Sequence, residues 1–245
     1  MIEQNHNDVR ELAMSAVSGW LTQYIEIPGF RDWKNQSMVA TLTNDIDDQQ
    51  LVIKPFPHSD EVISEHRVIS SYLNLVTALQ DIAEMEYYFR RYPFSGLPVS
   101  RANHLRHTCE AFFSKIYIFE ERLTQTLNEI QRVTLPQKLN VSGIKKAFQK
   151  SFRKDLRERN DIHHHVPYKD VELDQISMIN LLQYAPTADF CGEELERLRC
   201  RQVSKDWVLR VRSRTNAASR FVDAVGSAML QHCDFLEQGG NSASE

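Results

Sequence analysis

The sequence has little glycine, proline and cysteine, and it has no long apolar run. Only 8 glycines and 8 prolines occur in 245 residues, which excludes long structureless stretches. No segment reaches the roughly 20 apolar residues that a membrane span needs. The segment from Met1 to Arg10 is polar and carries acids, unlike a secretory signal. We therefore expect a cytoplasmic protein with no membrane partner.

The cysteines and the overall charge also narrow the class of protein. The four cysteines form no CxxC pair, which argues against a zinc site or a disulfide framework and predicts reduced thiols. Hydrophobic residues make up 42% of the chain and charged residues 25%, as in ordinary globular proteins. The net charge of −4 indicates no partner by itself, because the position of the charges matters more.

Helical periodicity dominates the chain after residue 58. Apolar residues recur at helical spacing on both sides of a turn rich in Pro and Gly at 93–98, so two long helices should pack antiparallel there. A third helix should begin at Ser142 and stop near Val166, because the residue before Pro167 avoids helical angles. The expected helices are 60–92, 100–132, 142–166, 172–183, 193–201 and 204–238.

The first 57 residues have a different pattern. A helix is expected over 7–27, ended by Pro28-Gly29. The segments 37–43 and 50–56 are rich in Val, Thr and Ile, which predicts a small β-hairpin. The expected fold is therefore mainly all-α. An up-down four-helix bundle over 58–238 follows an N-terminal extension over 1–57 and precedes a disordered tail over 239–245.

The segment from Arg157 to His165, RERNDIHHH, is the most informative part of the sequence. At roughly 100° per residue, Phe148 and Phe152 fall within about 20° of Arg159 on a helical wheel. Arg159 is thus expected within the apolar stripe, where a guanidinium needs a partner or a cleft. Alternatively, Arg159 extends to solvent at the end of the bundle or pairs with a buried acid. Histidines are favourable near a helix C-terminus in any case, because the helix dipole stabilises their charged form.

This segment resembles the signature of HEPN-domain proteins. The signature is an Arg followed by a polar residue, with a His four to six residues further on. Here these residues are Arg159, Asn160 and His164, with His163, His165 and Arg157 as alternates. The resemblance covers roughly residues 60 to 236 and implies an up-down helical bundle with the signature late in a core helix.

The resemblance implies metal-independent cleavage of RNA without a cofactor. The ribose 2′-OH attacks the adjacent phosphate and leaves a cyclic phosphate and a 5′-OH. His164 would act as general acid and base, Arg159 would clamp the phosphate and stabilise the transition state, and Asn160 would orient the phosphate or the His. In the family two signatures face each other across a dimer, so a C2 homodimer is expected.

The same resemblance suggests a biological setting. HEPN ribonucleases usually serve in prokaryotic toxin–antitoxin or phage-defence systems. An antitoxin or another regulatory protein is therefore an expected partner.

Basic residues gather in two stretches of this acidic protein. From Lys145 to Arg159 there are seven basic residues and two acidic ones, and from Arg197 to Arg220 eight and one. Localised positive charge favours a polyanion such as RNA as partner. A solvated basic helix face is the alternative interpretation. The candidate RNA contacts are Lys150, Arg153, Lys154, Arg210 and Arg214.

Two other functions fit the same residues. The His triplet could bind a metal, with His104 and His107 as further ligands, although no HExxH or i, i+4 His pair accompanies it. The chain could also be a catalytically inactive HEPN-like dimeric interaction module that binds a partner protein or nucleic acid. In that case Arg159 and His164 would be structural or would only bind phosphate.

Overall fold

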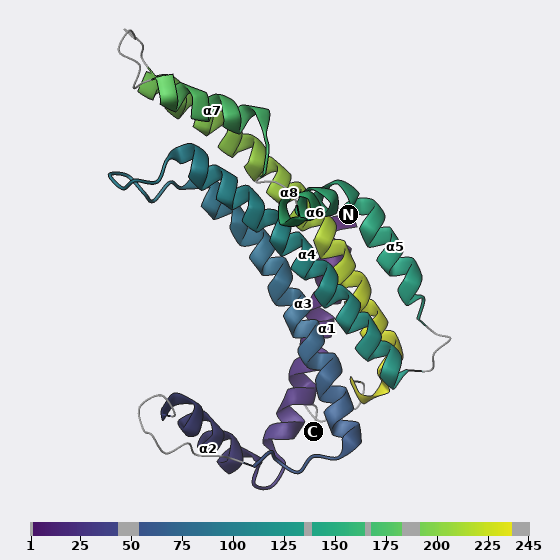
Figure 1. Ribbon diagram of the computed structural model, residues 1–245. Coiled ribbons are helices and arrows are strands. Elements are labelled where there is room, and N and C mark those ends of the chain that lie inside the picture. The colour runs from purple at the N-terminus through teal and green to yellow at the C-terminus, as the bar shows by residue number, and fades with distance from the viewer. Residues whose placement is uncertain (1, 44–53, 135–138, 165–167, 183–191, 237–245) are drawn as a thin grey trace. The chain divides into compact units, whose positions relative to one another are not determined.

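The computed structural model describes residues 2–43, 54–134, 139–164, 168–182 and 192–236, and their regular structure is helical throughout (Figure 1). This confirms the predicted mainly-α fold class. The elements are α1 (Ile2–Ile25), α2 (Phe30–Thr43), α3 (Asp60–Arg90), α4 (Arg101–Val133), α5 (Val141–Ser151), α6 (Arg153–His164), α7 (Val171–Leu182), α8 (Gly192–His232) and the 3₁₀ turn η1 (Asp234–Leu236).

The predicted β-hairpin is wrong. Residues 37–43 form the second half of α2, where the Thr41 hydroxyl donates to the Ser37 carbonyl at 2.8 Å. The helix starts after Gly29, whose φ of 82° provides the left-handed turn after α1. The β-branched residues of this segment therefore continue a helix that begins before them. Continuing that helix outweighs their preference for strands. The predicted hairpin turn, 44–48, lies outside the described residues.

Two predicted helix boundaries are also wrong. The helix expected from Ser142 is two helices, because it is interrupted at Phe152, which has φ −109° and ψ 15°. In contrast, 193–201 and the helix expected from Ser204 form the single helix α8. Cys200, Val203 and Trp207 are all buried and share one helical face, so the apolar stripe continues across Ser204.

The chain divides into two compact units. Unit 1 comprises the described residues within Met1–Tyr72, Thr126–Leu139 and Asp223–Glu245, and unit 2 those within Leu73–Gln125 and Asn140–Val222. The helices α3, α4 and α8 contribute residues to both units. This division differs from the predicted boundary at residue 57, because α1 belongs to the core of unit 1.

Unit 1 is held together by the inner face of α1. The residues Ala13, Val17 and Trp20 are buried, and the Trp20 indole donates to the Glu65 carboxylate at 2.8 Å. Arg10 donates from Nε to the buried carboxylate of Asp223 at 3.0 Å. These contacts join α1 to the first turns of α3 and to the last turns of α8, so α1 is part of the core of unit 1.

In unit 2 the helices alternate in direction. Lys115 of α4 pairs with Asp81 of α3 at 2.7 Å, and the His104 ring lies 3.2 Å from the Tyr88 carbonyl, so the partner numbers fall as α4 advances. This confirms the predicted antiparallel packing of these two helices. The α5–α6 pair runs antiparallel to α8, as two further pairs of contacts indicate: Phe148 with Phe221, and the Ser151 carbonyl with Arg214. Figure 1 shows this arrangement.

Candidate functional site

The Arg159 guanidinium lies at the protein surface, on the last turns of α6. It stacks on the ring of Tyr117 from α4, with 3.8 Å between the guanidinium carbon and the ring centroid. Its Nη1 donates to the Asn160 side-chain oxygen at 3.3 Å. Arg159 is half-buried, and within the described part of the chain it makes no ion pair with a carboxylate. An aromatic ring and an amide thus hold a cation whose charge is not neutralised by an acid.

The helical wheel predicted that Arg159 lies within the apolar stripe. The interruption at Phe152 explains why it does not. Phe148 and Phe152 are both fully buried, but the next buried position is Asp155 and not Arg159. The wheel assumed one continuous helix, and the non-helical ψ of Phe152 turns α6 relative to α5. Arg159 therefore moves from the predicted core position to the edge of the core.

The buried carboxylate of Asp155 pairs with two arginines of α8. Arg210 approaches it at 2.8 Å and Arg214 at 2.9 Å. Arg210 also lies over the Trp207 ring at 4.6 Å, and Arg214 lies over the Phe152 ring at 5.5 Å. Both guanidinium groups, which the sequence suggested as RNA contacts, are thus paired and packed within unit 2.

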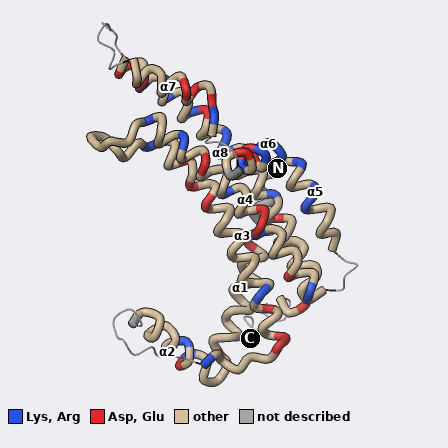
Figure 2. The backbone as a smooth tube through the Cα atoms, viewed as in Figure 1, with Lys and Arg blue, Asp and Glu red and all other residues tan. Residues whose placement is uncertain are grey.

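Three other candidate residues of α6 line a shallow hollow of about 460 Å³. Asn160, Arg153 and Arg157 line it, but so do Glu120 and Asp161, so its charge is mixed. The remaining lining residues are Tyr117, Gln149 and Leu156. Figure 2 shows the basic residues along α5 and α6.

The side chains of Lys150 and Lys154, which are also candidate RNA contacts, are exposed to solvent. Together with Arg153 and Arg157 they give α5 and α6 four exposed basic side chains. The sequence pattern does not single out Tyr117. Its signal, an aromatic residue between the buried Ile116 and Phe119 of α4, is common to many helix surfaces.

The three histidines fall at the limit of the described structure. The helix α6 extends to His164, one turn beyond Asn160, but the side chains of His163 and His164 lie outside the described residues, as does all of His165. Within the described ranges no group of three His, Cys, Asp or Glu side chains is arranged to hold a metal ion.

The two other histidines considered as ligands make local contacts. Nε2 of His104 lies 2.9 Å from the Arg91 carbonyl and 3.2 Å from the Tyr88 carbonyl. Since carbonyls only accept, this nitrogen carries the proton and donates to the C-terminal end of α3. The Nδ1 atom of His107 lies 3.3 Å from the Glu110 carboxylate.

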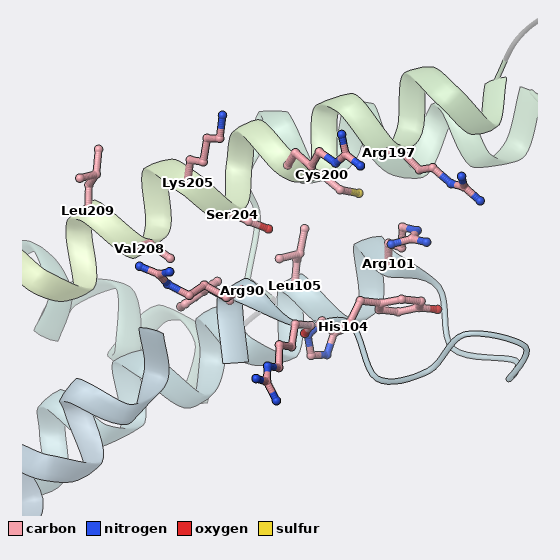
Figure 3. Close-up of a pocket in the computed structure, with 14 residues that line it drawn as sticks. Arg90, Arg101, His104, Leu105, Arg197, Cys200, Ser204, Lys205, Val208 and Leu209 are labelled. Carbon is pink, nitrogen blue, oxygen red and sulfur yellow. The ribbon is translucent and has the colours of Figure 1, made fainter. Parts of the chain in front are cut away.

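A second and larger hollow of unit 2, about 750 Å³, lies where the end of α3 and the start of α4 meet α8 (Figure 3). We call it the basic pocket. Its basic residues are Arg90, Arg91, Arg101, Arg197, Arg201 and Lys205. No Asp or Glu is among its described lining residues, and its floor includes the buried side chains of Phe89, Leu105, Cys200 and Val208. Burial raises the pKa of the Cys200 thiol to about 11, and Glu196 adds to the rise.

The basic stretch that the sequence indicates, Arg197 to Arg220, includes the arginines of α8 but not Arg90, Arg91 and Arg101. The signal was present, because Arg90, Arg91 and Arg101 flank the turn between two helices that were expected to be antiparallel. Such a turn brings the last residues of one helix beside the first residues of the next. What the sequence could not supply was the position of α8 opposite that turn.

Comparison of the chain with family models, with curated proteins and with solved structures gave no match. None of the helices in the described ranges has the length and apolar character required to cross a membrane.

Proposed function

We propose that this protein is a metal-independent endoribonuclease of the HEPN type, with Arg159, Asn160 and His164 as its catalytic group. The observation that carries the proposal is the state of Arg159, which is held on Tyr117 at 3.8 Å and is not paired with an acid in the described part of the chain. A cation of this kind is available for a phosphate. Arginine suits that role because its planar fork matches phosphate oxygens in two hydrogen bonds.

The roles follow from the chemistry of RNA cleavage. A base must take the proton from the ribose 2′-OH while the oxygen attacks the phosphorus, and an acid must protonate the departing 5′-oxygen. Imidazole performs both steps near neutral pH, and His164 supplies it one turn beyond Asn160. Arg159 stabilises the extra negative charge on the pentavalent phosphorus, and Asn160, hydrogen-bonded to Arg159 at 3.3 Å, keeps the guanidinium oriented.

The exposed basic residues of α5 and α6 support a polyanionic substrate. Lys150, Arg153, Lys154 and Arg157 are all solvent-exposed on α5 and α6, where they can contact the phosphates of an RNA strand. Arg210 and Arg214 are not assigned to RNA, because Asp155 pairs with both.

An inactive interaction module is the second candidate, and exposed apolar side chains favour it. The side chain of Val171 is 74% exposed and that of Leu181 70% on α7, and Leu198 on α8 is also exposed. Large apolar side chains exposed to solvent are available to contact a partner protein. Such contacts are compatible with a homodimer or with a regulatory partner, so they do not exclude catalysis.

The experiment that tests the proposal compares RNA cleavage by the wild type and single variants in excess EDTA. Total RNA and tRNA are incubated with purified wild type and with Arg159→Ala, Asn160→Ala and His164→Ala. His163→Ala and His165→Ala determine which histidine of the triplet acts. The control is Arg220→Ala, since Arg220 is an exposed arginine of α8 away from this group.

The wild type and Arg220→Ala should cleave RNA in EDTA. Arg159→Ala and His164→Ala should each lower the rate by about 100-fold or more, the usual contribution of an acid–base or charge-stabilising residue. Circular dichroism checks that each variant is folded. The absence of cleavage by the wild type, or equal rates in all variants, would reject the enzyme and leave the interaction module.

A further inference from the structure

The basic pocket of unit 2 gathers positive charge from three helices. Its cations come from the end of α3, the start of α4 and the first half of α8: Arg90, Arg91, Arg101, Arg197, Arg201 and Lys205. In the close-up, Arg101 and Arg197 lie at the same end of the pocket although they come from different helices (Figure 3). Like charges that converge repel one another, so a ligand of this pocket should carry several negative charges.

The cations of α8 differ in their pairing within the protein. Arg90 and Arg197 are each paired with a glutamate of their own helix, at 2.5 Å. The side chains of Arg201 and Lys205 are exposed, and in the described part of the chain they form no ion pair with a carboxylate. These two cations are therefore available to an acidic ligand.

The side chains of α8 at the pocket form two rows, each with a spacing of four residues. The inner row is buried or half-buried: Cys200, Ser204 and Val208. The outer row is exposed: Arg197, Arg201, Lys205 and Leu209. Rows with this spacing are the ridges along which a second helix packs. The outer row is thus a ridge of three cations followed by one leucine.

The spacing of the outer row matches that of side chains on another helix. Four residues of α-helix rise about 6 Å, so Arg201 lies about 6 Å along the axis from both Arg197 and Lys205. Carboxylates at positions i, i+4 and i+8 of a second helix repeat over the same distance, so they can face all three cations at once. An apolar residue at i+12 would then contact Leu209.

The apolar part of the pocket suits an aliphatic side chain better than a flat ring. Phe89 is 2% exposed and stacks on Trp207, with 5.0 Å between the ring centroids. The Tyr92 ring is covered on one face by the Arg101 guanidinium, at 4.5 Å from the centroid. A nucleic-acid base stacks on an accessible ring face. Leu209, which is 63% exposed, offers instead an aliphatic contact.

We infer that the basic pocket is the docking surface for an acidic amphipathic helix of a partner protein. Carboxylates of that helix, four residues apart, pair with Arg197, Arg201 and Lys205, and an aliphatic side chain packs on Leu209. The pocket, about 750 Å³ in volume, has room for several side chains of such a helix. It does not include Arg159, so the inference goes beyond the proposed RNA cleavage and does not depend on it.

The test is isothermal titration of the full chain with three designed peptides. Each has about 16 residues in an Ala-rich background, a length that allows a helix to form in water. The first carries Glu at i, i+4 and i+8 and Leu at i+12. The second has the same composition in an order without the four-residue spacing, and the third has Lys in place of Glu. Circular dichroism checks that the three are equally helical.

The first peptide should bind best. It should bind at least about tenfold more tightly than the second, which has the same charge but cannot face the three cations together. The third should not bind, because its charges repel those of the pocket. Binding of the first peptide should weaken as the salt concentration rises.

Charge reversal identifies the surface. The double variant Arg201→Glu/Lys205→Glu should weaken binding of the first peptide by at least about tenfold and should bind the Lys peptide instead. The matched control is Arg199→Glu/Arg220→Glu, which changes the net charge equally at two exposed positions of α8 that do not line the pocket. It should bind as the wild type does. His164→Ala should also bind normally, which separates this inference from the proposed ribonuclease.

Four results would overturn the inference. The first peptide does not bind the folded wild type at millimolar concentration, or it binds no better than the second. The two double variants lose binding equally, which would indicate attraction by net charge alone. Single-stranded RNA or ATP binds in place of the peptide, and Arg201→Glu/Lys205→Glu abolishes that binding. The wild type forms dimers in analytical ultracentrifugation that this variant dissociates, so that a second copy of the chain covers the pocket.

Discussion

The carboxylate of Asp155, which is fully buried, accepts a hydrogen bond from Nη2 of Arg210 at 2.8 Å. The pair joins α6 to α8, and the Arg210 guanidinium lies between this carboxylate and the Trp207 ring. A buried carboxylate needs such a partner, because the loss of water would otherwise destabilise its charge. The register of α6, and with it the exposure of Arg159, therefore depends on this contact.

Replacement of Asp155 should destabilise the protein. Asp155→Asn should lower the free energy of unfolding by about 3 kcal/mol, the lower end of the range for breaking a buried pair, because both arginines are partly exposed. Urea unfolding followed by circular dichroism measures it. The control Asp161→Asn, an exposed acid on the same helix, should change stability by less than about 0.5 kcal/mol. Equal effects of the two variants would contradict a structural role for Asp155.

Tyr117 should act as a positioning residue for Arg159. Tyr117→Leu removes the ring that holds the guanidinium, and it should lower the rate of RNA cleavage by about tenfold, the equivalent of about 1.4 kcal/mol. Tyr117→Phe keeps the ring and should retain the rate. Cleavage kinetics with both variants provide the measurement. A loss in Tyr117→Phe equal to that in Tyr117→Leu would indicate that the hydroxyl, which interacts with Glu121, matters instead.

Alkaline pH should weaken unit 1 through Tyr72. Burial raises the pKa of Tyr72 to about 12, above the ordinary value of about 10. The folded state thus disfavours the tyrosinate, so the stability from the neutral form is complete below about pH 10 and is lost as the pH rises through about 12. Urea unfolding at several pH values should show a smaller loss above pH 10 for Tyr72→Phe than for the wild type.

Two comparisons make this prediction specific. In the described residues the Tyr72 hydroxyl has no hydrogen-bond partner, so Tyr72→Phe should be as stable as the wild type at pH 7. Tyr88→Phe, at an exposed position, should follow the wild-type pH dependence. If Tyr72→Phe loses as much stability as the wild type above pH 10, Tyr72 does not cause the alkaline transition.

A larger side chain at position 226, which is Gly226, should destabilise the protein. A Cβ at this position would lie 3.0 Å from the Tyr72 hydroxyl oxygen and 3.3 Å from the Ala13 Cβ. Gly226→Leu should therefore cost about 1–3 kcal/mol of stability through overpacking, although leucine favours a helix more than glycine does. Thermal unfolding checks it. Ala224→Leu, at an exposed position of the same helix, should be neutral, and equal losses in both variants would reject close packing as the reason.

The sequence predicted the fold best where one helix carries an uninterrupted apolar stripe. Eight apolar residues at helical spacing within 100–132 are all buried in α4: Leu105, Cys109, Phe112, Ile116, Phe119, Leu123, Leu127 and Ile130. The start expected at residue 100 also agrees, because the Ser100 hydroxyl accepts from the Asn103 amide at 3.1 Å, whereas the helix expected from Ser142 is capped by Asn140. Local pattern was sufficient because packing and propensity favour the same structure there.

Where tertiary contacts set the local conformation, the sequence was insufficient. The interruption at Phe152 leaves the spacing of Phe148 and Phe152 unchanged, so a helical wheel does not detect it. As a consequence Asp155, and not Arg159, is the buried residue of α6. Its ion-pair partner, Arg210, comes from another helix. The basic pocket needed the same long-range information. The candidate residues of the signature were nevertheless found from the sequence, and their catalytic role stays a prediction.

The ends of the RNA products distinguish cleavage by attack of the 2′-OH without a metal, which we propose, from other ways of cutting RNA. RNA is cleaved by the wild type in excess EDTA, and the fragments are analysed by mass spectrometry. The account predicts a 2′,3′-cyclic phosphate on one fragment, a 5′-OH on the next, and no cut where the 2′-OH is replaced by 2′-O-methyl. Fragments with 3′-OH and 5′-phosphate ends, or cleavage that EDTA abolishes, would contradict it.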